Sequence, residues 1–201
     1  MLYEFIYLAS KSPRRQILLQ QLGIAFELLL AQEDEDSEKL EVVLAEESAI
    51  SYVQRVTKLK FDAAVHRVKN QNLPVVPVLC SDTTVAFGDR ILGKPSSTQE
   101  AKEMLYFLSG KTHKVLTSVA VGTSVKMIQI LSVSEVTFVT LSAQQINDYV
   151  ASLEPFGKSG SYGIQGKAAA FISHISGSYS GIMGLPLYET AELLKEFEFK
   201  I

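Results

Sequence analysis

The residues Leu8-Ala9-Ser10-Lys11-Ser12-Pro13-Arg14-Arg15 form the first junction between a strand and a helix that the sequence predicts. The mostly apolar run before them is typical of a buried strand, and the run after them has helical spacing. Ser12 suits a helix N-cap and Pro13 suits the first helical position. Strand and helix signals alternate in the same way along the rest of the chain, which predicts an α/β fold.

Arg14 and Arg15 therefore fall in the first turn of a helix, where positive charge is unexpected. The first turn presents unpaired N–H groups and the positive end of the helix dipole, which normally favour carboxylates. Two guanidinium groups at this place repel that field unless an anion lies among them. The sequence therefore predicts a phosphate or polyphosphate site at this junction.

The composition is that of an ordinary soluble globular protein. The chain has 201 residues, of which 47% are hydrophobic and 20% are charged, and its net charge is −3. This balance argues against a general nucleic-acid-binding surface, which would be basic. Cys80 is the only cysteine, which excludes an internal disulfide. With no basic leader and no uncharged apolar run of roughly 20 residues, we expect a cytoplasmic protein without a membrane span.

The expected elements surround one mixed sheet in a single domain that spans 1–201 and has two lobes. The sequence predicts helices at 51–68, 97–108, 142–152 and 187–197, and the second and third of these open with capping boxes. It predicts strands at 26–30, 75–80, 85–87, 91–92, 114–121 and 127–139. The last two strands are expected to form a long antiparallel hairpin.

Asp82 is the first candidate for chemistry. It follows the strand predicted at 75–80, and open α/β sheets place ligands at the carboxyl ends of such strands. A carboxylate there can hold a divalent cation or activate a water molecule. The alternative is a turn or helix cap assisted by Ser81 and Thr83. Position alone leaves both interpretations open.

Two further segments have the residue types of ligand-binding loops. In Gly93-Lys94-Pro95 the proline excludes a helix, so the lysine would project from a fixed loop and suit a phosphate. In 160–166 closely spaced glycines surround Gln165, whose amide can read the edge of a base. The alternatives are a solvated turn for the first segment and an ordinary glycine-rich turn for the second.

Other polar residues have ordinary interpretations when they are considered alone. Glu35 lies in the acidic stretch 33–47, for which a solvated loop with a short helix is expected. Lys60 lies on the helix predicted at 51–68, where an exposed lysine is the default. The three histidines, His113 among them, are far apart and lack the spacing of a zinc site, so each is expected to be structural or exposed.

Taken together, these segments resemble the Maf family of nucleoside triphosphate pyrophosphatases. The similarity extends over nearly the whole chain, and the number and order of the matching blocks make it specific. The blocks are 8–15, Tyr52-Val53-Gln54-Arg55 with Lys60, Ser81-Asp82-Thr83, Leu92-Gly93-Lys94-Pro95, Met104-Leu105-Tyr106-Phe107-Leu108-Ser109-Gly110 with His113, Tyr162-Gly163-Ile164-Gln165-Gly166 and Gly184-Leu185-Pro186-Leu187-Tyr188-Glu189-Thr190.

The resemblance implies an inosine-triphosphatase-like α/β fold with an active-site cleft between two lobes. It implies hydrolysis of a nucleoside triphosphate between the α and β phosphates, with Mg²⁺ or Mn²⁺, to give the monophosphate and pyrophosphate. Family members that act on 7-methyl-GTP have the sequence Ser-Asp-Gln around the central acid. This chain reads Ser81-Asp82-Thr83 there, which favours the branch that acts on dTTP and UTP.

The resemblance also implies roles for individual residues. Asp82 corresponds to the proton acceptor and Glu35 to an acid needed for activity, and both are candidates for holding the metal. The positions that set substrate specificity are matched by Arg14, Thr83 and Gln165. The polyphosphate-binding set is matched by Ser10, Arg15, Lys60 and Lys94. The chain departs from the family pattern at Phe61 and at Gly157, the residue before Lys158.

Two alternatives stay open at this stage. The first keeps the enzyme class and changes the substrate to a modified pyrimidine triphosphate. The second is a regulator of septum formation that binds a nucleotide or a nucleic acid without catalysis, although the acidic balance of the chain disfavours DNA as a ligand. The resemblance points to a homodimer as the oligomeric state.

Overall fold

The computed structural model describes residues 3–32, 35 and 37–201. The strands are β1 (Ile6–Leu8), β2 (Phe26–Leu28), β3 (Val78–Phe87), β4 (Arg90–Leu92), β5 (Thr112–Gly122), β6 (Met127–Phe138) and β7 (Ile172–Ser176). The α-helices are α1 (Pro13–Gln21), α2 (Ala49–Asn70), α3 (Thr98–Leu108), α4 (Ala143–Ala151), α5 (Tyr179–Met183) and α6 (Leu187–Lys195). Short 3₁₀ helices, η1 (Ser37–Glu41), η2 (Ser159–Ser161) and η3 (Lys167–Phe171), lie in the connections.

The described strands form one mixed sheet, which confirms the predicted α/β class. Their order is β2-β1-β3-β5-β6-β7, and β4 pairs with the end of β3. β1 pairs in parallel with β2 and β3, whereas β3, β5, β6 and β7 pair antiparallel. The hairpin of β5 and β6 is the one that the sequence predicts, and it supplies the longest strands of the sheet.

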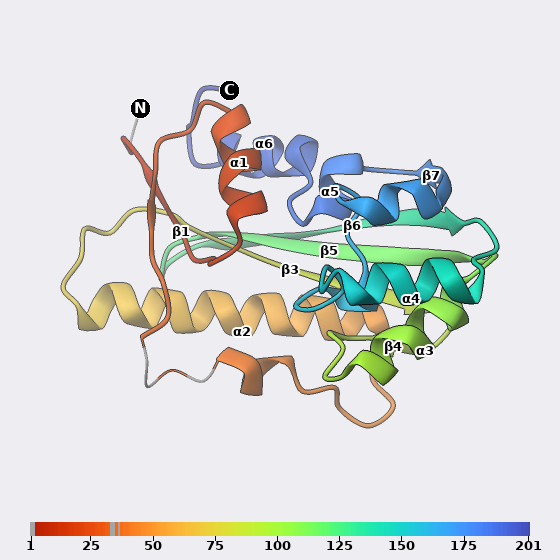
Figure 1. Cartoon of the computed structure of the whole chain (residues 1–201). Helices are drawn as coiled ribbons and strands as arrows, with labels where there is room; N and C mark the ends of the chain where they lie inside the picture. Colours follow the sequence, from red (N-terminus) through yellow and green to blue (C-terminus); the bar gives the residue numbers. More distant parts are fainter. Residues whose placement is uncertain (1–2, 33–34, 36) are drawn as a thin grey trace.

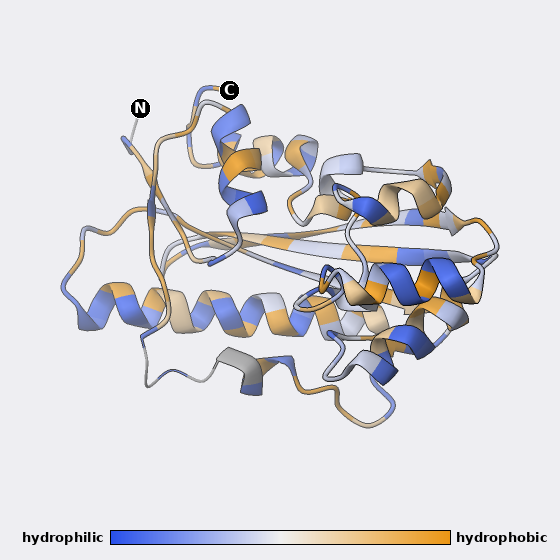
Figure 2. Ribbon diagram, in the orientation of Figure 1, coloured by the Kyte–Doolittle hydropathy of each residue, from blue (hydrophilic) through white to orange (hydrophobic). Residues whose placement is uncertain are grey.

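Helices cover both faces of the sheet (Figure 1). α2 runs along one face, and α1, α5 and α6 lie over the other. The alternation of side chains along β3 produces these two layers, because Leu79 packs with Leu18 of α1 while Cys80 packs with Phe61 of α2. Figure 2 shows polar and apolar residues alternating along α2, as expected for a helix with one buried side. Cys80 is a buried core residue.

The boundaries of β3 differ from the sequence prediction. The strand expected at 75–80 starts only at Val78 and continues to Phe87, paired with β5 from Val78 to Ala86. Pro77 restricts the start, since a proline has no N–H for the ladder, and Val75 is exposed. Asp82 therefore lies in the middle of a long central strand and not at its carboxyl end, and the interpretation as a turn cap is wrong.

Several helix starts agree with the sequence. α1 begins at Pro13 after Ser12, although the Ser12 side chain makes no capping bond and its N–H donates to Ser10 Oγ at 3.2 Å. α4 opens with the predicted capping box of Ser142 and Gln145. No helix in the described part of the chain combines the length and the apolar composition that a membrane span requires.

His113 is buried in a cluster of aromatic side chains at the end of the sheet that carries α3 and α4. Its Nε2 lies 2.7 Å from the Tyr162 hydroxyl oxygen, and its ring contacts Phe138 and Tyr162 edge to face. Nδ1 has no hydrogen-bond partner among the described residues. Burial lowers the pKa of His113 from 6.5 to about 4, so the imidazole is neutral at physiological pH.

This burial predicts a loss of stability as the pH falls from 6.5 toward about 5. In this window the unfolded chain takes up a proton that folded His113, with its pKa of about 4, does not accept. The unfolding free energy should fall by up to ~1.4 kcal/mol per pH unit. Denaturant unfolding at a series of pH values measures the slope. His113→Gln should flatten it, whereas His174→Gln, which removes an exposed imidazole, should not.

Carboxylates whose pKa is lowered in the folded state, such as Glu35, Glu41 and Glu47, also contribute to the unfolding free energy. That contribution is lost only as the pH falls below their ordinary pKa of 4.5. They therefore do not confound the slope above pH 5. Equal slopes for the wild type and His113→Gln would contradict the assignment of this titration to His113.

Candidate active site

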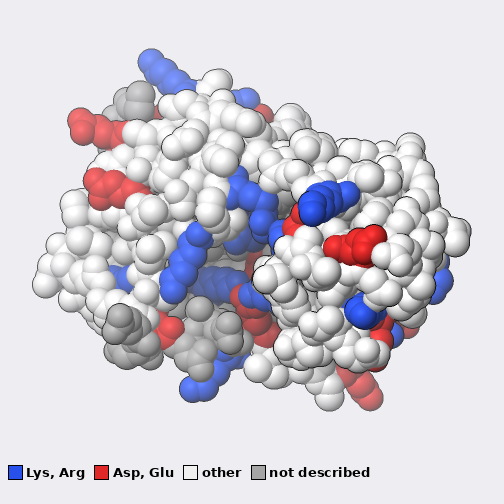
Figure 3. Space-filling view, viewed as in Figure 1, with Lys and Arg blue, Asp and Glu red and all other residues white. Residues whose placement is uncertain are grey.

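A cavity of about 1110 Å³ opens between the start of α1, the middle of β3, α2 and the glycine-rich loop 157–166. Figure 3 shows lysine and arginine side chains gathered in a hollow of the surface. The described residues that line the cavity include seven lysines and arginines and four carboxylates. This local excess of positive charge on a chain of net charge −3 is typical of a site for a polyanion.

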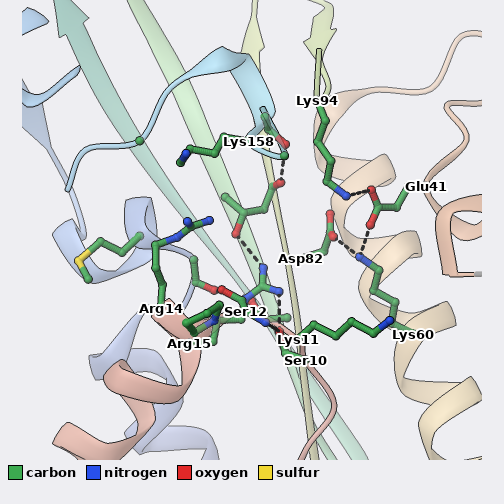
Figure 4. A pocket seen from close by; sticks show the side chains of 18 of the residues that line it. Ser10, Lys11, Ser12, Arg14, Arg15, Glu41, Lys60, Asp82, Lys94 and Lys158 are labelled. Atoms are coloured by element: carbon green, nitrogen blue, oxygen red, sulfur yellow. Dashed lines mark hydrogen bonds and ion pairs between the residues drawn. The ribbon is translucent and has the colours of Figure 1, made fainter. Parts of the chain in front are cut away.

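The centre of the cavity is a chain of four alternating charges. The Lys60 ammonium group lies 2.6 Å from Asp82 Oδ1 and 2.7 Å from Glu41 Oε1, and Lys94 lies 2.6 Å from Glu41 Oε2. These residues come from α2, β3, η1 and the loop after β4, so four separate elements meet here (Figure 4). Asp82 has only 7% of its surface exposed, and its carboxylate points toward α2.

The ion pairs hold Lys60 and Glu41 in their charged forms. Burial lowers the pKa of Lys60, but Asp82 and Glu41 together outweigh burial and raise it. Burial raises the pKa of Glu41, and Lys60 and Lys94 outweigh that effect and lower it. An anion that enters the cavity therefore meets a Lys60 ammonium group that is already protonated and already in place.

Arg15 is fixed at the opposite face of β3 by uncharged acceptors. Nε donates to the Gly184 carbonyl at 2.8 Å, Nη1 to Ser10 Oγ at 3.3 Å and Nη2 to Thr83 Oγ1 at 3.3 Å. Burial lowers its pKa, and the nearby Asp82 charge opposes that shift. Because the contacts leave its charge without a carboxylate in direct contact, Arg15 is prepared to bind an anion.

Gly184 needs to be glycine at this place. Its φ is +115°, a conformation that other residues rarely adopt. Its carbonyl accepts both Arg15 Nε and the Ser81 hydroxyl, the latter at 2.9 Å. The turn after α5 thereby joins the start of α1 to β3.

Arg14 and Lys158 provide the remaining positive charge. Figure 4 shows both across the cavity from Lys60 and Lys94. The Arg14 side chain has no hydrogen bond or ion pair with any residue that the structure describes, and among these residues the Lys158 ammonium group donates only to the backbone carbonyl of Glu154. Burial lowers the pKa of Lys158, as does the Arg14 charge, while Glu154 raises it.

The residues predicted from the sequence occupy this one cavity, with different environments. Ser10, Arg14, Arg15, Lys60, Asp82, Thr83, Lys94, Gln165 and Glu35 all line it. Gln165 is exposed, and its amide has no partner among the described residues. Glu35 forms a two-fold ion pair with buried Arg67, at 2.6 and 2.9 Å, and does not contact Asp82. The rest of its acidic surroundings, 33–34 and 36, lies outside the described residues.

Glu41 is a candidate that sequence reasoning missed. It lies in the stretch 33–47 among many other acids, and no local pattern distinguishes it from them. Only the packing of η1 against α2 brings it to Lys60. The acidic stretch is thus not uniformly solvated, since the side chain of Glu41 is 23% exposed.

The described residues fit a divalent cation bound together with a substrate. Asp82 and Glu41 converge on one ammonium group, and Mg²⁺ in nucleotide sites is commonly held by one or two carboxylates together with phosphate oxygens and water. No group of three or more histidine, cysteine, aspartate or glutamate side chains suited to a metal occurs among the described residues. The donor set therefore suits a cation that arrives with a phosphate ligand better than one held by protein alone.

Comparisons with known proteins identify the family of this chain. The family model described as Maf-like protein matches residues 5–197. A dTTP/UTP pyrophosphatase of Albidiferax ferrireducens is 60% identical over 198 residues, covering 98% of this chain and 99% of the relative. Proteins with the same name from a Polaromonas species and from Cupriavidus metallidurans are each 58% identical, covering 98% and 95% of this chain and 98% and 96% of the relatives. The chain therefore belongs to the Maf-like protein family.

Proposed function

We propose that this protein is a nucleoside triphosphate pyrophosphatase that hydrolyses dTTP and UTP to the monophosphate and pyrophosphate. The observation that carries the proposal is a carboxylate, Asp82, in a cavity with an excess of lysine and arginine. The names of relatives that are 58–60% identical over nearly the whole chain support the substrate assignment. Removal of non-standard pyrimidine nucleotides from the nucleotide pool fits the same chemistry.

In the proposed reaction a water molecule attacks the α-phosphorus. Asp82 accepts a proton of that water while the new P–O bond forms. The bond between the α-phosphorus and the bridging oxygen breaks, and its electron pair leaves with pyrophosphate. The Lys60 ammonium group lies 2.6 Å from Asp82 Oδ1, so it orients the carboxylate before the proton is transferred.

Arg15, Lys60 and Lys94 stabilise the negative charge of the phosphates and of the departing pyrophosphate. Such preorganised donors act without having to reorganise during the reaction, which makes them effective in a site with little water. Ser10 supports this set by accepting a hydrogen bond from Arg15. Asp82 and Glu41 would hold a divalent cation, which when bound supplies further charge neutralisation at the phosphates.

We assign base selection to Arg14, Thr83 and Gln165. Gln165 carries both a donor and an acceptor on one amide, which suits the edge of a pyrimidine. Thr83 is already bonded to Arg15 and lies 2.9 Å from Thr117, so it acts mainly by shaping the wall of the cavity. Arg14 remains available to a ligand.

The substrate is tested by pyrophosphate release across a panel of nucleotides. With Mg²⁺ or Mn²⁺, kcat/KM for dTTP and UTP should exceed that for GTP, ATP and CTP by at least about tenfold, because the base edge is read by hydrogen bonds. Equal rates for GTP and UTP would contradict the assignment of the pyrimidine. Salt-sensitive DNA binding without hydrolysis of any nucleotide would instead favour a regulator.

Asp82→Asn should keep the fold and lose turnover. The amide is close in size to the carboxylate but does not accept the proton, so kcat should fall by roughly 10²- to 10⁴-fold. Pyrophosphate release and thermal unfolding measure the two effects. Asp62→Asn, which removes an exposed carboxylate of α2 that pairs with Lys58, is the matched control and should keep full turnover. Near-wild-type turnover of Asp82→Asn would refute the mechanism.

Glu41→Gln should mainly lower turnover, and Glu35→Gln should mainly lower stability. Glu41 contacts both Lys60 and Lys94, so replacing its carboxylate by an amide should lower kcat/KM strongly with little change in stability. Glu35 neutralises buried Arg67, so its amide should lower the unfolding free energy by about 2 kcal/mol with a smaller effect on turnover. Steady-state kinetics and denaturant unfolding of both variants decide between them. Loss of turnover in Glu35→Gln at unchanged stability would place Glu35 in the catalytic machinery.

A further inference from the structure

The loop 157–166 carries Gln165 into the cavity, and its two halves are held in different ways. The first half is tied to the strands of the site: the Gly160 N–H donates to the Gly93 carbonyl at 3.0 Å, and the Ser159 hydroxyl donates to the Thr83 carbonyl at 3.2 Å. The Tyr162 hydroxyl also fixes this half of the loop, because it hydrogen-bonds to Nε2 of His113 on β5. None of these contacts reaches the segment after Tyr162.

Glu154 holds the second half of the loop. Its Oε2 accepts the backbone N–H of Lys167 at 3.0 Å, two residues after Gln165. Its Oε1 accepts the hydroxyl of Tyr149, on α4, at 3.1 Å. The carboxylate is therefore a bridge between a buried helix residue and the backbone next to Gln165.

Two glycines of the loop lie directly against the side chains of Glu154 and Lys158. A Cβ atom on Gly166 would collide with the Glu154 carboxylate, and one on Gly163 would lie 3.0 Å from Cδ and Cε of Lys158. Lys158 in turn donates to the Glu154 carbonyl. The segment from Gly163 to Lys167 thus packs on Glu154 and Lys158 from both sides, and only glycine allows this close approach.

We propose that Glu154 is a positioning residue for base selection, which acts by fixing the backbone on which Gln165 stands. The proposal rests on the proposed function, since it assigns to Gln165 the reading of the pyrimidine. Glu154 contacts neither Asp82 nor Lys60 nor Lys94. Its loss therefore removes the anchor of the Lys167 backbone next to Gln165, although Ile164 stays packed against the core, and it leaves the contacts of Asp82, Lys60 and Lys94 unchanged.

The test compares Glu154→Ala with Gln165→Ala on the nucleotides UTP and GTP and on inorganic tripolyphosphate. For UTP, Glu154→Ala should raise KM by about tenfold, the size of one lost hydrogen bond, and lower the preference for UTP over GTP by a similar factor. For inorganic tripolyphosphate, which has no base, the inhibition constant should stay within about twofold, because the phosphate side is unchanged. A general structural defect would weaken both ligands alike.

Three further variants sharpen the comparison. Glu154→Gln keeps one acceptor oxygen and should retain part of the preference for UTP. Gly166→Ala places a methyl group where the carboxylate lies and should reproduce the loss seen in Glu154→Ala. Glu103→Ala, which removes an exposed carboxylate of α3, is the matched control and should behave as the wild type.

The double variant Glu154→Ala/Gln165→Ala decides whether one residue acts through the other. If it does, the double variant should lose no more preference for UTP than Gln165→Ala alone. Additive losses would overturn the proposal, as would unchanged preference in Glu154→Ala when Gln165→Ala has lost it. Unchanged preference in Gln165→Ala itself would instead contradict the reading of the base by Gln165, which belongs to the proposed function.

Discussion

The alternation of side chains along β3 is the constraint on which the rest of the site depends. Ser81 and Thr83 point to the face covered by α1 and α5, where they bond to Gly184 and Arg15. Asp82 points to the other face, where Lys60 of α2 binds it. One strand therefore places Asp82 on one side of its backbone and, on the other side, the Ser81 and Thr83 side chains that contact Gly184 and Arg15. A shift of register by one residue would exchange the two faces and separate every pair.

The same strand explains how so many charges can share one cavity. On the α2 face each ammonium is opposed by a carboxylate, so the cost of burying Asp82 is offset by an ion pair. On the α1 face Arg15 is held by a carbonyl and two hydroxyl groups, which satisfy its donors without cancelling its charge. Among the described residues of the cavity, Arg14, Arg15 and Lys158 thus carry positive charge that no carboxylate pairs directly, beside the paired Lys60 and Lys94. This division of roles accounts for an anion site on an acidic protein.

Much of the fold could be predicted because it is encoded locally. The α/β alternation, the start of α1 at Pro13 and the capping box of Ser142 each depend on a few neighbouring residues, and all were confirmed. The extent of β3 could not be predicted in this way. Asp82-Thr83-Thr84 has the composition of a turn, and it is drawn into the strand only by its ladder with β5, which is distant in sequence. Glu41 escaped prediction for the same reason, since tertiary packing alone distinguishes it from the neighbouring acids.

The glycine-rich loop 157–166 is also positioned by residues that are distant in sequence. Its first half is bonded to the carbonyl of Thr83, next to Asp82, and to that of Gly93, next to Lys94. Gly160 adopts a φ of +70°, and a side chain there would press against Val85 of β3. The loop is therefore anchored to the two backbone segments that carry Asp82 and Lys94. In the proposed function, a base that Gln165 reads is therefore held by a loop anchored beside Asp82 and Lys94, so that selection of the base and placement of the α-phosphorus depend on the same backbone segments.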